Sequence, residues 1–272
     1  MNEKSGLSGI ITKSIALGIL VPVFMVTTSF FVSASPVIKA KGADGDASVM
    51  REDMKSENIP ASHDVSDQEE ITHSEFDKIT FSPDDWKLIL VNKQHPIPEG
   101  YEFPIGDINS YMQCDERMRE SLMRMLSAAN AEKIFIFVAS PYRSDDMQDE
   151  IFSKSVDALM VDGVSFADAY KETSQEITIP GTSEHQIGLA VDIIIDYYPK
   201  LDEGFSKTKA YQWLIENCAD YGFILRYPRG KEEITGTSFE PWHYRYVGEE
   251  AAQVIMEEGL TLEEFIDEYV NR

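Results

Sequence analysis

The alternation of apolar and polar positions predicts a mixture of strands and helices after residue 130. Residues 134–139 form an apolar run that predicts a strand, and residues 189–195 predict another, with both faces mostly apolar. A further strand is predicted at 223–228. Helices are predicted where apolar residues recur three or four positions apart: 207–223, 248–259 and 261–270. This order of elements favours an α+β domain over a doubly wound sheet.

The stretch SPYRSDDMQDEIF, residues 140–152, predicts a tight turn followed by a helix. Ser144 or Asp145 would cap that helix, and Gln148 would form a capping-box-like pair with Asp145. The segment 156–170 is also predicted to be helical. At the chain's end, Thr261 and Glu264 predict a capping box.

The N-terminus combines two lysines with a long apolar run at residues 15–32. This layout predicts that residues 1–34 are a signal peptide or an N-terminal membrane anchor. Small residues at Val32 and Ala34 offer cleavage positions, whereas the length of the run suits a bilayer of about 30 Å. Both alternatives place the rest of the chain outside the cytoplasm, either anchored to the membrane or secreted to the cell wall.

Residues 35–82 form an acidic polar segment without helical or alternating periodicity. Such a composition buries too little apolar surface to order itself, so we expect a disordered tether. Residues 83–272 are then long enough for a single domain with a substantial core.

Charge and cysteine content narrow the range of partners. The 24 lysines and arginines against 48 acids give a net charge of −24, which disfavours nucleic acid as a partner. Cys114 and Cys218 are the two cysteines. A disulfide would be permitted outside the cytoplasm, but Cys218 lies on the apolar face of its predicted helix, which favours two free thiols.

Candidate chemistry begins with TSEHQIGLAVDI, residues 182–193, where Asp192 stands among aliphatic neighbours. A buried carboxylate is costly unless a cation, donors or a metal compensates it. His185 lies seven residues earlier, which is the opposite face of a straight strand, so a turn at Gly188 would have to bring the two together. The alternative is that Asp192 pairs with an arginine and His185 is a surface residue.

A second stretch, FEPWHYRYVG at residues 239–248, contains His243 in dense aromatic surroundings. Two imidazoles and one carboxylate are a common zinc ligand set, with a fourth position left for water in catalytic sites. Pro241 disfavours a helical conformation at Glu240, so that carboxylate could lie beside the metal and act as general base. The alternative for Glu240 is a solvated loop acid. Both imidazoles would also need an acceptor for their second nitrogen.

Arg143 would project from the end of the 134–139 strand. A guanidinium there can hold a carboxylate through two parallel hydrogen bonds, as a substrate with a free C-terminus requires. The alternative is a surface ion pair with one of the nearby acids. Gln148 has two possible roles, as a helix cap or as a contact for the substrate.

These three stretches, together with LILVNKQHPIPEGY at residues 88–101, resemble the zinc carboxypeptidases of bacterial cell-wall metabolism. The resemblance covers residues 83–250 and is to the VanY-like D-alanyl-D-alanine carboxypeptidases and their LdcB-like L,D-carboxypeptidase relatives. It implies an α+β domain with a central antiparallel sheet flanked by helices. By motif it implies that His185, Asp192 and His243 bind Zn2+, Glu240 is the catalytic base, Arg143 binds the substrate carboxylate, and Tyr142, Gln148 and Ser183 line the pocket.

The activity implied by this resemblance is removal of the C-terminal D-Ala from peptidoglycan stem peptides. We favour D,D-carboxypeptidase activity, with L,D-carboxypeptidase action on tetrapeptide stems as the alternative. A non-catalytic module that binds wall peptides is disfavoured because binding alone needs no base at Glu240. The implied partners are stem peptides, and the membrane if the N-terminal segment stays uncleaved.

Overall fold

The computed structural model describes residues 79–271. The expected signal peptide or anchor, residues 1–34, lies outside the described residues, as does most of the expected tether. Within 79–271, no helix combines the length and the apolar character that crossing a membrane would take.

A four-stranded antiparallel sheet forms the centre of the domain, in the order β3-β4-β6-β5. Its strands are β3 (Ile136–Ser140), β4 (Ala190–Ile195), β5 (Phe223–Leu225) and β6 (His243–Tyr246). The three predicted strands appear as β3, β4 and β5, and the expected α+β architecture with a central antiparallel sheet is confirmed. The register of β4 against β6 places Asp192 directly opposite His243.

Strand β4 is buried along its whole length, as its two apolar faces predicted. Val191, Ile193 and Ile195 belong to the main core cluster, whereas Asp192 is only 2% exposed. A carboxylate therefore lies inside the sheet, where each of its oxygens requires a partner.

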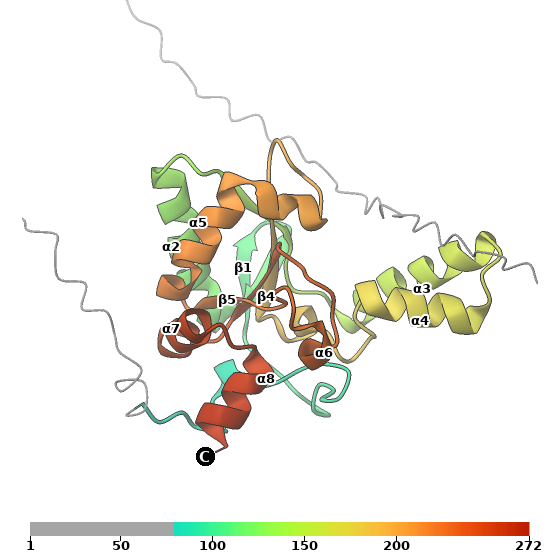
Figure 1. Ribbon diagram of the computed structural model, residues 1–272, viewed down its shortest axis with the longest axis horizontal. Coiled ribbons are helices and arrows are strands. Elements are labelled where there is room, and N and C mark those ends of the chain that lie inside the picture. Colours follow the sequence, from blue (N-terminus) through green and yellow to red (C-terminus); the bar gives the residue numbers. More distant parts are fainter. Residues whose placement is uncertain (1–78, 272) are drawn as a thin grey trace, which may run out of the picture.

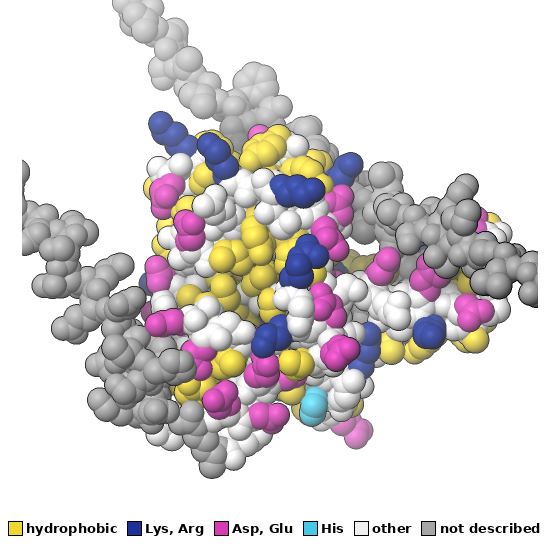
Figure 2. Space-filling view, viewed as in Figure 1, with side chains coloured by type: hydrophobic (Ala, Val, Ile, Leu, Met, Phe, Trp, Pro, Cys, Tyr) yellow, Lys and Arg dark blue, Asp and Glu magenta, His cyan; other side chains and the backbone are white. Residues whose placement is uncertain are grey.

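Helices surround the sheet, and most of them lie close to it (Figure 1). The α-helices are α2 (Glu116–Ala131), α3 (Asp145–Val161), α4 (Phe166–Glu176), α5 (Lys209–Asn217), α6 (Glu232–Thr235), α7 (Glu249–Glu258) and α8 (Leu262–Phe265). Shorter turns of helix are η1 (Trp86–Leu88), η2 (Glu184–Ile187), η3 (Glu203–Lys207), η4 (Cys218–Tyr221) and a π-helical turn, η5 (Ile266–Val270). The visible face of the domain carries scattered acidic side chains with lysines and arginines among them (Figure 2).

Helices α3 and α4 form a hairpin that projects from the rest of the domain (Figure 1). Ser144 caps α3 by accepting from the Met147 amide, as predicted. The predicted pair between Asp145 and Gln148 is wrong, because the Gln148 side chain is fully buried and bonded elsewhere. The helical prediction for 156–170 holds except at the turn between α3 and α4.

Several elements were not predicted from the sequence, including β6, α6 and the elements at the start of the domain. A short hairpin of β1 (Ile105–Asn109) and β2 (Met112–Asp115) precedes α2. Burial alternates along β1, but its buried position is Gly106 whereas Ile105 is exposed, so the residues show no apolar alternation. Helix α2 does carry a helical signal, since its buried residues recur at three- and four-residue spacing: Met118, Leu122, Met125 and Ala129.

The C-terminal helices form a second core cluster with residues from the start of the described chain. Phe81 meets the Phe265 ring edge-on, with 4.8 Å between centroids. The predicted capping box of Thr261 and Glu264 is confirmed at the start of α8. Both cysteines are buried and free, as predicted.

Candidate metal centre

A tight turn between η2 and β4 carries His185 to the sheet. Gly188 adopts φ 70° and ψ 12°, the left-handed conformation that glycine tolerates best. A Cβ at this position would lie 2.6 Å from the Phe103 ring and 2.8 Å from the Asp115 amide nitrogen. The position therefore requires glycine for both its conformation and its packing, and the predicted role of Gly188 is confirmed.

The turn brings His185, Asp192 and His243 together as a buried group. His185 Nε2 lies 3.3 Å from Asp192 Oδ1, and His243 Nδ1 lies 3.1 Å from the same oxygen. One ligand atom from each residue lies within 4.8 Å of the other two. Of the residues described by the structure, these three form the group with the composition and spacing of a metal site.

The second nitrogen of each imidazole has its own acceptor. His185 Nδ1 donates to the Pro141 carbonyl oxygen at 2.9 Å, and His243 Nε2 faces Glu184 Oε2 at 3.5 Å. Since a carbonyl and a carboxylate only accept, these nitrogens carry the protons. His185 Nε2 and His243 Nδ1 are then the nitrogens free to bind a metal, and both face Asp192.

The electrostatics of the group suit a cation. Burial and the nearby Arg143 lower the pKa of His185 to about 4, so this imidazole is neutral, as a metal ligand must be. Burial alone would raise the pKa of Asp192, but the two histidines hold it well below its ordinary range. At His243 burial opposes protonation, yet Asp192 and Glu184 outweigh it and raise the pKa to about 9. The negative charge that stabilises a proton there would equally stabilise a metal ion.

Arg143 contacts the other oxygen of Asp192. Its Nη2 donates to Asp192 Oδ2 at 3.1 Å, Nε donates to Ser140 Oγ at 2.9 Å, and Nη1 donates to Gln148 Oε1 at 3.2 Å. The alternative reading of Asp192 is thus correct about an arginine partner but wrong about His185, which is buried. A guanidinium has five N–H groups, so one on each terminal nitrogen remains for a substrate.

Gln148 holds Arg143 in place and does not cap α3. Its Nε2 donates to the Thr178 carbonyl oxygen at 2.7 Å while its Oε1 accepts from Arg143. The side chain is fully buried under the start of α3. Gln148 thereby connects Arg143 to the segment that follows α4.

Glu240 lies beside the group without being part of it. Its Oε2 is 3.7 Å from His243 Nδ1, and the side chain is 13% exposed, which contradicts the alternative of a solvated loop acid. Burial raises the pKa of Glu240 to about 8, with opposing contributions from the charges around it. A carboxyl group with a pKa near neutrality can take up and release a proton, as a general base must.

The remaining two predicted pocket residues lie next to these elements. The Tyr142 amide donates to the Gln113 carbonyl oxygen at 3.0 Å, and its ring meets Phe103 edge-on. Ser183 is buried and directly precedes η2, although its side chain does not cap that turn. Their roles in substrate binding stay predictions.

Three charged residues that the sequence reasoning missed lie behind His243. Glu184 Oε1 accepts from Arg226 Nε and from Arg245 Nη1, each at 2.7 Å, and all three side chains are fully buried. Burial alone would raise the pKa of Glu184, but the two guanidinium groups hold it well below its ordinary range. The signal was available, because Arg226 and Arg245 interrupt apolar strands just as Asp192 does.

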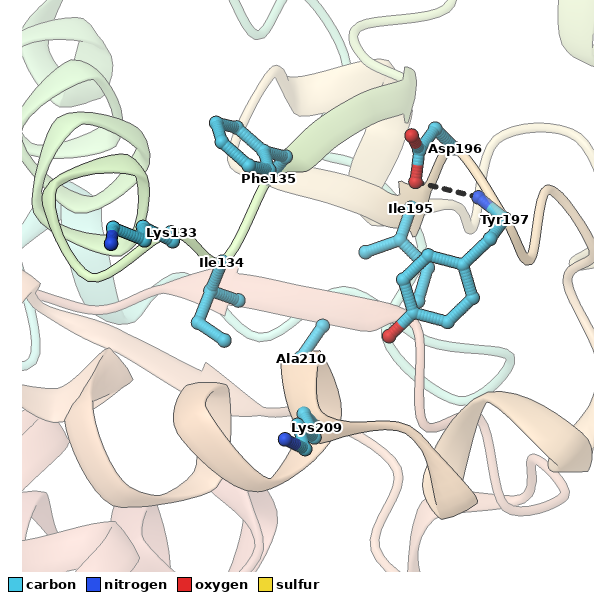
Figure 3. A pocket seen from close by; sticks show the side chains of 8 residues that line it. All are labelled: Lys133, Ile134, Phe135, Ile195, Asp196, Tyr197, Lys209 and Ala210. Atoms are coloured by element: carbon cyan, nitrogen blue, oxygen red, sulfur yellow. Dashed lines mark hydrogen bonds between the residues drawn. The ribbon is translucent and has the colours of Figure 1, made fainter.

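Two hollows lie outside the metal group. One of about 480 Å³ is lined by Gln186, Asp145 and Tyr101 among others, directly beside the turn that holds His185. The other, of about 230 Å³, lies beyond the last residue of β4 and is lined by aromatic, aliphatic and lysine side chains (Figure 3). None of the three metal ligands lines either hollow, although Gln186, which lines the first, is next to His185 in the sequence.

Two buried imidazoles and a carboxylate, with a second carboxylate alongside, define the centre of a zinc-dependent hydrolase. The comparison with known proteins agrees: the family model described as VanY, D-alanyl-D-alanine carboxypeptidase, matches residues 111–249. The chain belongs to this family, and the resemblance inferred from the sequence is confirmed.

Several relatives are similar over the same region. A D-alanyl-D-alanine carboxypeptidase of Enterococcus faecalis (strain ATCC 700802 / V583) is 44% identical over 185 residues, which cover 67% of this chain and 66% of the relative. A solved mutant of the vancomycin resistance D,D-pentapeptidase VanY, in complex with Zn(II), is 43% identical with a TM-score of 0.61, covering 67% of this chain and 99% of that one. The LdcB LD-carboxypeptidase structure is 36% identical with a TM-score of 0.56, covering 66% and 85%.

Proposed function

We propose that this protein is a zinc-dependent D,D-carboxypeptidase that removes the C-terminal D-Ala from peptidoglycan stem peptides. The observation that carries the proposal is the buried group of His185, Asp192 and His243 with Glu240 beside it, in a member of the VanY family. In this proposal the first three residues hold Zn2+ and Glu240 is the base.

Zinc in this position would polarise the scissile carbonyl and lower the pKa of a bound water to near 7. Glu240 would remove the proton from the attacking water and pass it to the departing amine. Its side chain suits this role because it is largely shielded from solvent yet lies 3.7 Å from the metal-facing nitrogen of His243. With zinc bound at His185 Nε2 and His243 Nδ1, both imidazoles would be neutral and keep their remaining proton on the nitrogen that faces Pro141 or Glu184.

Arg143 would bind the C-terminal carboxylate of the substrate. Its three contacts, to Ser140, Gln148 and Asp192, fix the plane of the guanidinium and leave an N–H on each terminal nitrogen. Two such donors in one plane match the two oxygens of a carboxylate. This selection of a free terminus would make the enzyme a carboxypeptidase. Tyr142, Gln148 and Ser183 would shape the surrounding pocket.

D,D activity is favoured over L,D activity by the degree of similarity. The chain is 43% identical to the D,D-pentapeptidase and 36% identical to the LD-carboxypeptidase. Both specificities would use the same zinc ligands and base, so the difference lies in the shape of the pocket.

The proposal is tested by incubating the purified protein with pentapeptide and tetrapeptide muropeptides and measuring the products by mass spectrometry. Loss of the fifth residue, abolished by a chelator and restored by zinc, is the expected result. Loss of the fourth residue instead would establish L,D activity. Zinc-dependent binding of either peptide without release of D-Ala would identify a binding module.

We also propose the domain arrangement 1–34, 35–82 and 83–272, with a signal peptide or anchor, a tether and the catalytic domain. The support is the composition of the first two segments and the wall-derived substrate. Such a substrate would require an extracytoplasmic location. Fractionation of cells that produce the full chain distinguishes an anchored protein from a secreted one.

A further inference from the structure

A chain of three charged residues, Glu263, Arg226 and Glu184, runs from helix α8 to the metal ligand His243. Glu263 on α8 accepts from Arg226 through two bonds of 2.7 and 2.8 Å, and Arg226 Nε donates to Glu184. Glu184 then faces His243 Nε2. Residue 263 lies outside the region matched by the family model, which ends at residue 249.

The two oxygens of Glu184 have different partners. Oε1 accepts from both Arg226 and Arg245, whereas Oε2 is the oxygen that faces His243 Nε2. The separation of 3.5 Å from His243 is long for a hydrogen bond, so a small shift of the carboxylate decides whether the bond forms. The position of the Glu184 carboxylate therefore decides whether His243 Nε2 has a hydrogen-bond acceptor.

The charges in this chain balance only when Glu263 is included. Arg226 and Arg245 are fully buried and carry two positive charges, against one negative charge on Glu184. Glu263 supplies the second negative charge, and its Oε1 accepts a hydrogen bond from Asn92 Nδ2 at 3.0 Å. Without Glu263, the buried cluster beside a cation site would have a net positive charge, which disfavours a metal ion.

Further contacts tie the same cluster to the backbone. The Arg226 amide, directly after β5, donates to the His243 carbonyl oxygen at 3.2 Å, so a backbone bond joins Arg226 to the metal ligand. Arg245 Nη2 donates to the carbonyl oxygens of Lys87 and Ile89 in the segment that opens the domain. The cluster is thus fixed from both ends of the described chain.

We propose that Glu184 is a positioning residue for His243, and that Glu263 acts through Arg226 to hold Glu184 in the orientation that leaves His243 Nδ1 free for zinc. This inference rests on the proposed zinc site. The partner of a metal-bound imidazole typically contributes about 10- to 100-fold in metal affinity. The proposal adds that the contribution is set in part from α8, the second element after β6 along the chain.

The test is the affinity of the full-length protein for zinc, measured by competition with a chromogenic chelator. Glu263→Gln should weaken zinc binding by about tenfold, the lower end of the range for such partners, and change the visible absorption of the Co2+-loaded protein. Glu184→Gln should weaken it at least as much. Should that variant fail to fold because two guanidinium groups lose their partner, Glu263→Gln still decides the matter.

Glu264→Gln is the matched control, since Glu264 lies next to Glu263 on α8 and pairs with Lys231 instead. This control should leave zinc affinity and the Co2+ spectrum unchanged. The proposal is overturned if Glu263→Gln binds zinc as tightly as the unaltered protein. It is equally overturned if Glu263→Gln and the Glu264→Gln control weaken zinc binding by the same factor, in proportion to their loss of thermal stability. Because no substrate is needed, a protein that binds zinc but releases no D-Ala refutes the proposed function alone.

Discussion

Replacing Gly188 with alanine tests whether the turn that delivers His185 is as tightly constrained as the structure indicates. The substitution adds a single methyl group at a residue with φ 70°. That group would meet the Phe103 ring at 2.6 Å and the Asp115 amide nitrogen at 2.8 Å. The Asp115 amide also donates to the Gly188 carbonyl oxygen, so the backbone there cannot move away without breaking a bond.

The expected cost has two parts. A left-handed conformation costs an alanine about 1–2 kcal/mol more than a glycine. Forcing an extra carbon into a packed region adds about 1–3 kcal/mol, for a total of about 2–5 kcal/mol. Gly236→Ala is the matched control, because Gly236 has φ 68° and nothing within 4 Å of the added Cβ. It should cost only the first part.

The measurement is urea unfolding of both variants, compared at an unchanged slope so that the midpoints report stability. Zinc affinity should also fall in Gly188→Ala, since the Gly188 amide donates to the His185 carbonyl oxygen. If Gly188→Ala and Gly236→Ala lower the free energy of unfolding equally, the turn at Gly188 is not closely packed. Our account of how His185 reaches Asp192 would then be wrong.

Four further outcomes follow from the site. Glu240→Gln should lower kcat by about 100-fold or more while zinc content, measured by elemental analysis, stays the same; full turnover would reject Glu240 as the base. Arg143→Lys should lower kcat/KM by about 10- to 100-fold in steady-state kinetics with a pentapeptide, because a lysine cannot make two parallel hydrogen bonds to a carboxylate. An unchanged kcat/KM would reject Arg143 as the residue that binds the substrate carboxylate. Burial raises the pKa of Cys114 and of Cys218 to about 12, so a thiol reagent at pH 8 should label neither in the native protein and both in denaturant. Zinc at about 100 times its Kd should add about 2.7 kcal/mol to stability, and an unfolding midpoint insensitive to chelator would contradict a structural contribution of the metal.

The core of the site was predictable because its residues differ in polarity from their sequence neighbours. Asp192 in an apolar strand needed a partner, and Gly188 offered the turn through which His185 could reach it. Tertiary pairing decided the rest: the β4–β6 register that places His243 opposite Asp192 joins residues 51 positions apart, which no local period encodes.

The missed features have the same origin. Gln148 has the spacing of a helix cap, but a hydrogen bond from Arg143 and a distant carbonyl at Thr178 compete more successfully for its side chain. Glu184 sits beside His185 in the sequence, yet its importance comes from arginines about 40 and 60 residues away. Local sequence rules indicate which contacts a side chain can make, and residues distant in the sequence decide which of those contacts form.

The distribution of charge indicates where the site can accept a cation. The histidines contact one oxygen of Asp192 and Arg143 contacts the other, so that each oxygen of this buried carboxylate has a partner. Counting the arginines with the acids they contact, three negative charges are matched by three positive ones: Asp192, Glu184 and Glu263 by Arg143, Arg226 and Arg245. Glu240 has no arginine contact among the ion pairs of the described residues, and its Oε2 lies 3.7 Å from His243 Nδ1, a nitrogen that also faces Asp192. A divalent cation bound by His185, Asp192 and His243 would therefore place its charge next to Glu240. Of the four carboxylates, Glu240 is the one without an arginine partner, and it is the one that we propose as the base.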